Sequence, residues 1–216
     1  MLMKLYSYVV ARDFGFAPNP FFGFCTLATC KPQIRQQASV GDWVIGTGAK
    51  AKYHYGNRLI FALNVSEILT FNQYWWDPRF FLKRPNMTGS LKVLYGDNIY
   101  HHDGTKWVQA DSHHSLPNGL PNDVNTANDT KVDHVLVGTK FVYWGQYAPA
   151  IPKGFCSFGT NAVCIVKKGR GHRVFADDLP GAFDAWINQQ GRWGVQGNPI
   201  EFRHHAPQLR FPWAGT

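Results

Sequence analysis

The chain has 216 residues, of which 44% are hydrophobic and 15% aromatic, so it can form one well-packed domain, whereas two domains would be cramped. Charged residues make up only 17% of the chain, yet 22 Lys and Arg against 14 Asp and Glu give a net charge of +8. Such a basic surface favours a polyanion such as nucleic acid, although a need for solubility explains the charge equally well. No apolar run approaches the roughly 20 residues that cross a bilayer, which excludes a membrane-spanning helix.

The first half of the chain predicts short strands and turns, because glycine and proline interrupt it often. A loop at 14–24 contains five phenylalanines and is expected to fold over the hydrophobic core, with a ligand-binding role as the alternative. The other predicted elements are a strand at 4–11, a short helical turn from Pro32 to Gln36, strands at 42–47 and 58–68, and a short helix or irregular turn at 71–81.

A β-hairpin is the best-defined element of the second half, because Gly104-Thr105 fits a two-residue turn with glycine first, and Asp103-Gly104 fits the other common kind. The face that carries Ile99, His101, Val108 and Ala110 is expected to look inward, and the polar opposite face is expected to meet a ligand. The remaining predictions are a long polar loop at 112–131, strands at 134–144 and 161–168, and an amphipathic helix that begins near Asp177. Together these elements predict a single β-rich α+β domain over residues 1–216.

Four cysteines stand at positions 25, 30, 156 and 164, with spacings that match no zinc ribbon or knuckle. Buried, reduced thiols in a cytoplasmic protein are the favoured interpretation. The sequence therefore assigns no metal and identifies no cofactor.

The histidines supply the candidate catalytic residues, which are His102, Asp111 and His113. Neighbouring residues on a strand point to opposite faces, so each of the pairs at 101–102 and 113–114 offers one histidine to a single centre. General acid/base catalysis and a divalent metal site are both open, while hydrogen-bonded histidines in a polar groove are the favoured alternative. A hydrolase with Ser112 as nucleophile is disfavoured, because no glycine-flanked nucleophile elbow is present.

The loop KAKYHYGN at 50–57 combines lysines with rings that can stack on an unpaired base. An aspartate such as Asp77 or Asp111 would accept a hydrogen bond from a base amino group once the base leaves the stack. The candidate base-binding residues are Tyr53, His54 and Tyr55 in this loop, Trp75, Asp77 and Arg79 as an opposite wall, and Tyr100 and Gln109 on the polar hairpin face.

A basic turn, KKGRGHR at 167–173, suits phosphate contacts, although a solvated turn would have the same composition. The candidate phosphate-binding residues are Lys50, Lys52, Lys167, Lys168, Arg170 and Arg173. Neither a Walker loop nor a dinucleotide glycine fingerprint occurs, so a nucleotide-fuelled or redox enzyme is not expected.

Three segments resemble the EVE and ASCH type of PUA-like domain: GDWVIG at 41–46, IFALNVSE at 60–67 and YWWDPRF at 74–80. This resemblance implies a PUA-like β-barrel with peripheral short helices and long loops, which holds a nucleic-acid base near the loop after the first segment. The long histidine-bearing loop and everything after Gly145 depart from that pattern.

Nearly the whole chain also resembles the nucleotide modification associated domain 2 family of phages and bacteria. The similar segments are KLYSYVV at 4–10, GFAPNPF at 15–21, CTLATCKP at 25–32 and QADSHHS at 109–115. This resemblance implies a place in DNA base hypermodification, and other proteins of DNA modification as possible partners.

These patterns together predict a protein that binds DNA or a nucleotide, holds a modified and extruded base, and has no membrane partner. One alternative is an enzyme of base hypermodification that uses His102, Asp111 and His113. Another is a partner-binding subunit of a modification complex, which predicts an exposed apolar patch at 14–24.

Overall fold

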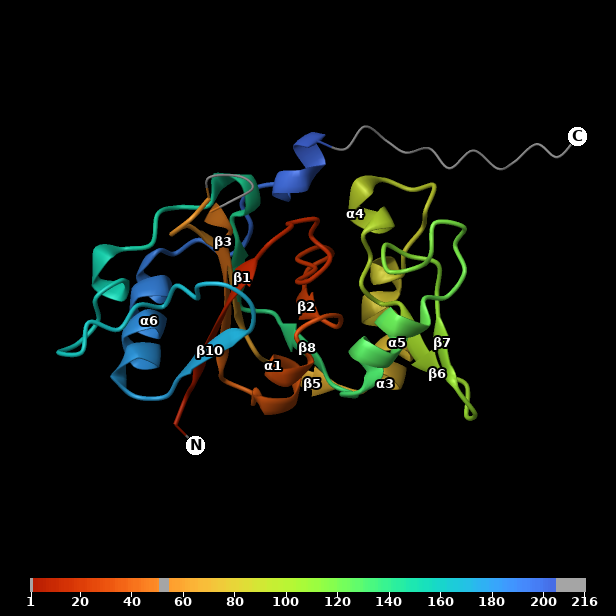
Figure 1. Ribbon diagram of the computed structural model, residues 1–216, viewed down its shortest axis with the longest axis horizontal. Helices are drawn as coiled ribbons and strands as arrows, with labels where there is room; N and C mark the ends of the chain where they lie inside the picture. The colour runs from red at the N-terminus through yellow and green to blue at the C-terminus, as the bar shows by residue number, and fades with distance from the viewer. Residues whose placement is uncertain (1, 51–54, 205–216) are drawn as a thin grey trace, which may run out of the picture.

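A computed structural model describes residues 2–50 and 55–204 of the chain and shows a mixed α+β protein (Figure 1). Strands gather in the middle of the molecule, with α6 (Asp178–Gln189) on one side of them and α3 (Phe71–Trp76), α4 (Leu91–Leu94) and α5 (Asp123–Thr130) on the other (Figure 1). Within the described ranges no helix has the length and apolarity needed to cross a membrane. The α+β class predicted from the sequence is confirmed.

The largest sheet contains six strands. They are β1 Leu5–Val10, β3 Trp43–Gly48, β4 Leu59–Asn64, β9 Phe141–Tyr143, β10 His172–Phe175 and β11 Gly194–Val195. Their order across the sheet is β10-β1-β3-β4-β9-β11. β1 runs parallel to β3 and antiparallel to β10, β4 is antiparallel to β3 and β9, and β11 is parallel to β9.

Two smaller sheets accompany the large one. Their strands are β2 Cys25–Leu27, β5 Glu67–Leu69 and β8 Val135–Gly138, in the order β2-β8-β5, and the hairpin β6 Tyr100–His102 with β7 Trp107–Gln109. Among the described residues, β10 and β11 remain the two edges of the six-stranded sheet, and β2, β8 and β5 pair with one another instead of joining it. The sheet is therefore open, and the predicted closed barrel is wrong.

Most helices are short. The α-helices are α1 Pro32–Gln37, α3 Phe71–Trp76, α4 Leu91–Leu94, α5 Asp123–Thr130 and α6 Asp178–Gln189, and the 3₁₀ helices are η1 Pro78–Lys83, η2 Gly145–Tyr147, η3 Lys153–Phe155 and η4 Ile200–His204. Thr70 begins α3 with a capping box, in which its hydroxyl accepts from the Gln73 N–H and the Gln73 side chain accepts from the Thr70 N–H. Pro32 at the first turn of α1 matches the expected helix start.

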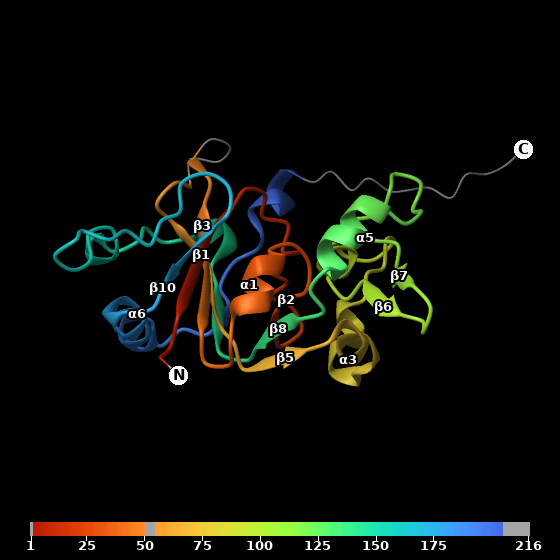
Figure 2. The same ribbon diagram turned by 60° about the horizontal axis from the view of Figure 1, so that its bottom comes forward.

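The six-stranded sheet buries apolar side chains on both faces. On one face, α6 contributes Leu179, Phe183 and Ile187, which are four residues apart and so lie on one side of the helix. The Phe183 ring packs edge-on against Trp43 of β3, with 5.7 Å between ring centroids. Figure 2 shows α1 on the other side of the sheet, between the sheet and α5. A third apolar cluster lies under α3 and the hairpin.

Five predicted elements need correction. The predicted strands at 58–68 and 134–144 are each divided in two, with β4 and β9 in the six-stranded sheet and β5 and β8 in the three-stranded sheet. Residues 161–168 do not form a strand, because β10 occupies the edge of β1 and Ile165 instead donates its N–H to the Phe155 carbonyl. The polar loop at 112–131 contains α5, which Asn122 begins by accepting from the Asn125 N–H. None of the five phenylalanines at 14–24 is exposed, so the apolar patch expected of a partner-binding subunit is not present there.

Candidate functional site

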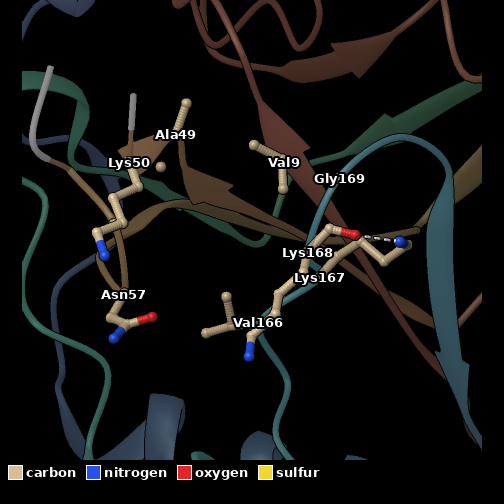
Figure 3. Close-up of a pocket in the computed structure, with 10 residues that line it drawn as sticks. Val9, Ala49, Lys50, Asn57, Val166, Lys167, Lys168 and Gly169 are labelled. Carbon is tan, nitrogen blue, oxygen red and sulfur yellow. Dashed lines mark hydrogen bonds between the residues drawn. The ribbon is translucent and has the colours of Figure 1, made fainter. Parts of the chain in front are cut away.

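A cleft with a volume of about 760 Å³ lies at the end of the parallel pair β1 and β3. Lys50 and Asn57 approach it from the segment after β3, and Lys167 and Lys168 approach it from the other side (Figure 3). None of the described residues that line it is acidic. The cleft therefore presents cationic groups from two segments that are more than a hundred residues apart.

Close backbone packing forms the wall at the end of β3. The Gly48 N–H donates to the Arg58 carbonyl at 2.9 Å, and a Cβ atom on Gly48 would lie 2.3 Å from the Tyr55 carbonyl oxygen. Only glycine fits at position 48, because the Cβ atom of any other residue would clash with the backbone of Tyr55. The segment after β3 is consequently held against the strand that leads back into the sheet.

A second hollow adjoins the first and shares Asn57, Val166, Lys167 and Lys168 with it. Arg173 lines this second hollow and donates to the Cys164 carbonyl at 2.7 Å. Four of the six predicted phosphate-binding residues are thus brought together: Lys50, Lys167, Lys168 and Arg173. Arg170 is exposed and lines neither hollow, and Lys52 lies outside the described residues.

Electrostatics at the edge of the cleft are positive. Partial burial, together with the nearby ammonium groups of Lys31 and Lys167, lowers the pKa of His172. Burial also lowers the pKa of Lys31, whose ammonium group lies over the Tyr8 ring, 4.7 Å from its centroid. A bound anion would relieve this concentration of positive charge. Neither Lys31 nor His172 was identified from the sequence.

Of the predicted base-binding loop, Tyr53 and His54 lie outside the described residues. Tyr55 packs against the core, and its hydroxyl donates to the Gln146 carbonyl at 2.8 Å. Tyr55 is therefore part of the folded core, and its hydroxyl is already hydrogen-bonded within the protein.

The predicted opposite wall lies elsewhere. Figures 1 and 2 both place α3 on the far side of the molecule from the end of β3. Trp75 stacks on the His101 ring at 4.4 Å, and Arg79 pairs with Asp77 at 2.6 Å and with Glu67 at 3.0 Å. These hydrogen bonds hold the pKa of the Asp77 carboxyl below its usual range. Trp75, Asp77 and Arg79 are not brought to the cleft.

The hairpin has the predicted register, and Ile99 is buried as expected, but part of the face predicted to meet a ligand is buried as well. Tyr100 pairs with Gln109 and His102 with Trp107, which leaves Gly104-Thr105 as the two-residue turn. Tyr100 and Gln109 are buried, whereas His101 and Val108 on the other face are partly exposed. Hydrogen bonds explain the burial of these two polar side chains, because the Tyr100 hydroxyl donates to Asp129 at 3.1 Å and accepts from the Gln109 amide at 3.2 Å.

The predicted catalytic residues occupy different surroundings. His102 accepts from the Gly104 N–H and packs against Trp107, while His113 packs among Phe14, Phe16 and Tyr95. Asp111 is exposed. In the described part of the chain, no group of three His, Cys, Asp or Glu side chains is arranged to hold a metal ion.

A different histidine, His114, belongs to a network around the buried carboxylate of Asp129. The ring Nδ1 of His114 lies 2.9 Å from Asp129 Oδ2, and its Nε2 lies 4.0 Å from the Cys30 sulfur. The other carboxylate oxygen accepts from the Cys30 N–H at 2.8 Å. We call Cys30, Arg35, Tyr100, His114 and Asp129 the Asp129 network.

Arg35 joins the parts of this network that are distant in sequence. Its buried guanidinium donates to the carbonyls of Cys30 at 3.0 Å, Val132 at 2.8 Å and His134 at 2.6 Å, and also to that of Asp129. Burial lowers the pKa of Arg35 to about 10 against the opposing effect of Asp129. α1 is thereby fixed to α5 and to the segment before β8.

The charge state of His114 follows from the same contacts. Burial lowers its pKa, but hydrogen bonds to Asp129 and Cys30 and the charges of these groups outweigh burial and raise it to about 9. The side chain of His114 is 17% exposed, whereas that of Asp129 is 1% exposed. The imidazolium is thus stabilised at a site that solvent still reaches.

The sequence pattern missed Cys30, Arg35, His114 and Asp129. The motif that holds both histidines was identified, but residues 112–115 form a turn, closed by the Ser115 N–H donating to the Ser112 carbonyl. The rule that strand neighbours point to opposite faces therefore does not apply there. Cys25 is buried as predicted, but Cys30, Cys156 and Cys164 are partly exposed.

The fold and the cleft define a mixed α+β protein with a positively charged cavity, of a volume within the roughly 300–1,000 Å³ of small-molecule sites. The chain belongs to the nucleotide modification associated domain 2 family, whose sequence profile matches residues 2–206, as the resemblance predicted. This membership associates the protein with nucleotide modification. No curated protein and no solved structure matches the chain.

Proposed function

We propose that the protein binds the phosphates of a nucleotide or of DNA in the basic cleft, as part of a nucleotide-modification pathway. The observation that carries the proposal is that Lys50, Lys167 and Lys168 line one cavity with no acidic residue among its described lining. Lysine ammonium groups attract phosphate and release its counterions, which gives affinity without base specificity.

We assign the base to the side of the cleft that Lys50, Gly56 and Asn57 border. A cavity of about 760 Å³ has room for one extruded nucleotide, and extrusion lets a protein contact the edge of a single, modified base. Recognition of a modified DNA base is the finer part of the proposal, and it is tested separately from phosphate binding.

The test is a titration of the protein with matched oligonucleotides, one plain and one carrying hypermodified bases, at several salt concentrations. For single strands, each phosphate contact contributes a slope of about −0.7 to the plot of log affinity against log salt. The double variant Lys167→Ala/Lys168→Ala should therefore reduce this slope by about 1.4 if both lysines contact phosphate.

Lys106→Ala/Lys131→Ala is the matched control, because it removes the same charge from the hairpin turn and from the residue after α5. An equal loss of affinity in both double variants would show that the cleft lysines act only through the net charge of the protein and do not form a specific phosphate site. Tighter binding of the modified strand would support base recognition. Absence of binding at low salt would overturn the proposed function as a whole.

A further inference from the structure

We propose that Cys30 is the nucleophile of a thiol-dependent acyl-transfer centre, with His114 as the general acid and base and Asp129 as the group that orients His114. The substrate class is an amide or ester carbonyl. The three residues come from the turn before α1, the turn at 112–115 and α5, so only the tertiary fold brings them together.

The geometry gives each group one role. Asp129 Oδ2 accepts from His114 Nδ1 at 2.9 Å, which leaves Nε2 facing the Cys30 sulfur at 4.0 Å. A nucleophile, a base within reach and a third group that holds the base define the arrangement of cysteine and serine acyl-transfer enzymes, whatever their order in the chain. The sulfur-to-nitrogen distance is loose, as is common before a substrate tightens such contacts.

Asp129 is itself held rigidly. Its carboxylate accepts from the Tyr100 hydroxyl at 3.1 Å and from the Cys30 N–H at 2.8 Å, and its carbonyl accepts from Arg35. The orienting group therefore has a fixed position among hydrogen-bond donors. A group so placed keeps the imidazole ring in one tautomer and one orientation.

A purely structural role for Cys30 and His114 would not need either side chain to be accessible to solvent. Cys25 is an example of a structural cysteine in this protein. Cys25 is fully buried, and burial raises the pKa of its thiol. Cys30, in contrast, is partly exposed and lies beside an imidazole that solvent reaches. Reactive cysteines occupy partly exposed, electropositive surroundings of this kind.

The reaction balances without an oxidant or a cofactor. The proton that the Cys30 thiol gives up resides on His114 Nε2 as the imidazolium, and the thiolate sulfur bonds to the substrate carbonyl carbon. The bond from that carbon to nitrogen or oxygen breaks, and His114 returns the proton to the departing amine or alcohol. Water then attacks the thioester, His114 takes its proton, and the acid and the free thiol are released.

The surroundings indicate what the substrate carries. Lys31 follows Cys30 directly and places its ammonium group over the Tyr8 ring, 4.7 Å from the ring centroid, so a cation lies close to Cys30 in the chain. The Phe16 ring packs on His114 at 4.6 Å and gives the site an apolar wall. An acyl group on a phosphate-bearing compound fits both features; this part of the inference rests on the proposed function.

The first experiment measures alkylation of the native protein by iodoacetamide, with each cysteine followed by peptide mass spectrometry. Cys156 and Cys164 serve as internal controls, because they are partly exposed and hydrogen-bond to each other. Burial and Cys164 raise the pKa of the Cys156 thiol, so Cys164 is the more stringent control. Cys30 should react about tenfold faster than either control near neutral pH. An equal or slower rate at Cys30 would overturn the proposal, and no variant is needed to see it.

The second experiment uses p-nitrophenyl acetate as a neutral acyl donor. An acetyl thioester should form on Cys30, disappear in Cys30→Ser and His114→Asn, and persist in Cys164→Ser. The alkylation rate of Cys30 in His114→Asn should fall about tenfold while that of Cys156 is unchanged, which a purely structural defect would not produce. Absence of both the thioester and a Cys30-dependent release of p-nitrophenol in the native protein would contradict the acyl-transfer role.

The pH profile of alkylation adds a readout specific to His114. The groups that face this ring are Cys30 and Asp129 by hydrogen bonds, Phe16 and His113 by ring contacts, and Arg35 and Tyr100 from behind Asp129. The profile should follow the titration of His114 and lose this inflection in His114→Asn; an unchanged profile would argue against coupling. Because the ester is neutral, these results do not depend on phosphate binding in the cleft.

Discussion

The basic cleft and the Asp129 network are both assembled from segments far apart in the chain, but they treat charge in opposite ways. In the cleft, Lys50 and Lys168 are exposed and no acidic residue stands among the described lining. In the network, the guanidinium of Arg35 is fully buried and donates to four backbone carbonyls. The first region keeps its cations available to a ligand, and the second uses its cation to hold the fold.

This difference predicts where mutations act. A buried charge that has lost its partners, or a set of carbonyls that has lost its donor, is costly because solvent does not replace the missing hydrogen bonds. An exposed lysine is hydrated before and after it is removed from a contact, so its loss affects binding and leaves stability nearly unchanged. The two regions should therefore separate in a comparison of unfolding with binding.

The largest expected effect is on Arg35→Ala. The substitution leaves four buried carbonyls without a donor and removes the link between α1 and α5, so the free energy of unfolding should fall by about 3–5 kcal/mol. Chemical denaturation measures the change, and Arg12→Ala, at an exposed position, is the control. A loss below about 1 kcal/mol would show that the Arg35 bonds are not what joins these segments.

The second prediction concerns His114 and pH. Its pKa rises from an ordinary 6.5 to about 9 on folding, so protonated His114 contributes stability that is fully present below pH 6.5 and is lost as pH rises through about 9. The size of the effect is on the order of 3 kcal/mol, at about 1.4 kcal/mol per pKa unit.

The measurement compares unfolding of the native protein and His114→Asn across this pH range. The difference in unfolding free energy should be largest at the acidic end and should shrink toward the alkaline end. A difference that stays constant with pH would mean that the hydrogen bond to Asp129 does not favour the imidazolium.

The sequence could predict the elements whose signals are local. The apolar spacing of four that gives α6, the alternation that gives β1 and the glycine that sets the hairpin turn all act over a few residues. The open sheet could not be predicted, because it depends on β10 reaching the edge of β1, more than 160 residues away along the chain. The register of the hairpin follows from its turn residues and could be predicted. The burial of Tyr100 could not, because it depends on a hydrogen bond to Asp129 in another segment.

The same division applies to the candidate sites. Lysines in the basic turn at 167–173 could be identified from composition, since charge clusters are visible in a sequence. Cys30, His114 and Asp129 could not, because their relation is a matter of hydrogen-bond geometry between segments 84 and 15 residues apart. His113 was chosen over His114 on a strand rule that a turn does not obey.

The third prediction links the cleft to the backbone that forms it. Gly48→Ala would place a Cβ atom 2.3 Å from the Tyr55 carbonyl oxygen, so the segment after β3 must shift. The cost should be about 1–3 kcal/mol in unfolding free energy, together with weaker phosphate binding. Gly181→Ala is the matched control, because it lies in α6 with no atom near the added methyl group and should be neutral or stabilising by up to about 1 kcal/mol. Equal changes in the unfolding free energy of the two variants would show that the segment after β3 can shift without destabilising the protein.

The smallest expected effect on stability is that of Lys167→Ala/Lys168→Ala. This variant gives the clearest contrast between the basic cleft and the Asp129 network. Both side chains lie at the protein surface, so the unfolding free energy should change by no more than about 0.5 kcal/mol. Binding of a single-stranded oligonucleotide should nevertheless weaken, with the salt slope reduced by about 1.4. Thermal unfolding and the salt titration on the same sample test both halves. A stability loss comparable to that of Arg35→Ala would mean that these lysines stabilise the fold. A lysine whose charge is available to a ligand makes few stabilising contacts within the protein, so its removal should affect binding and not folding.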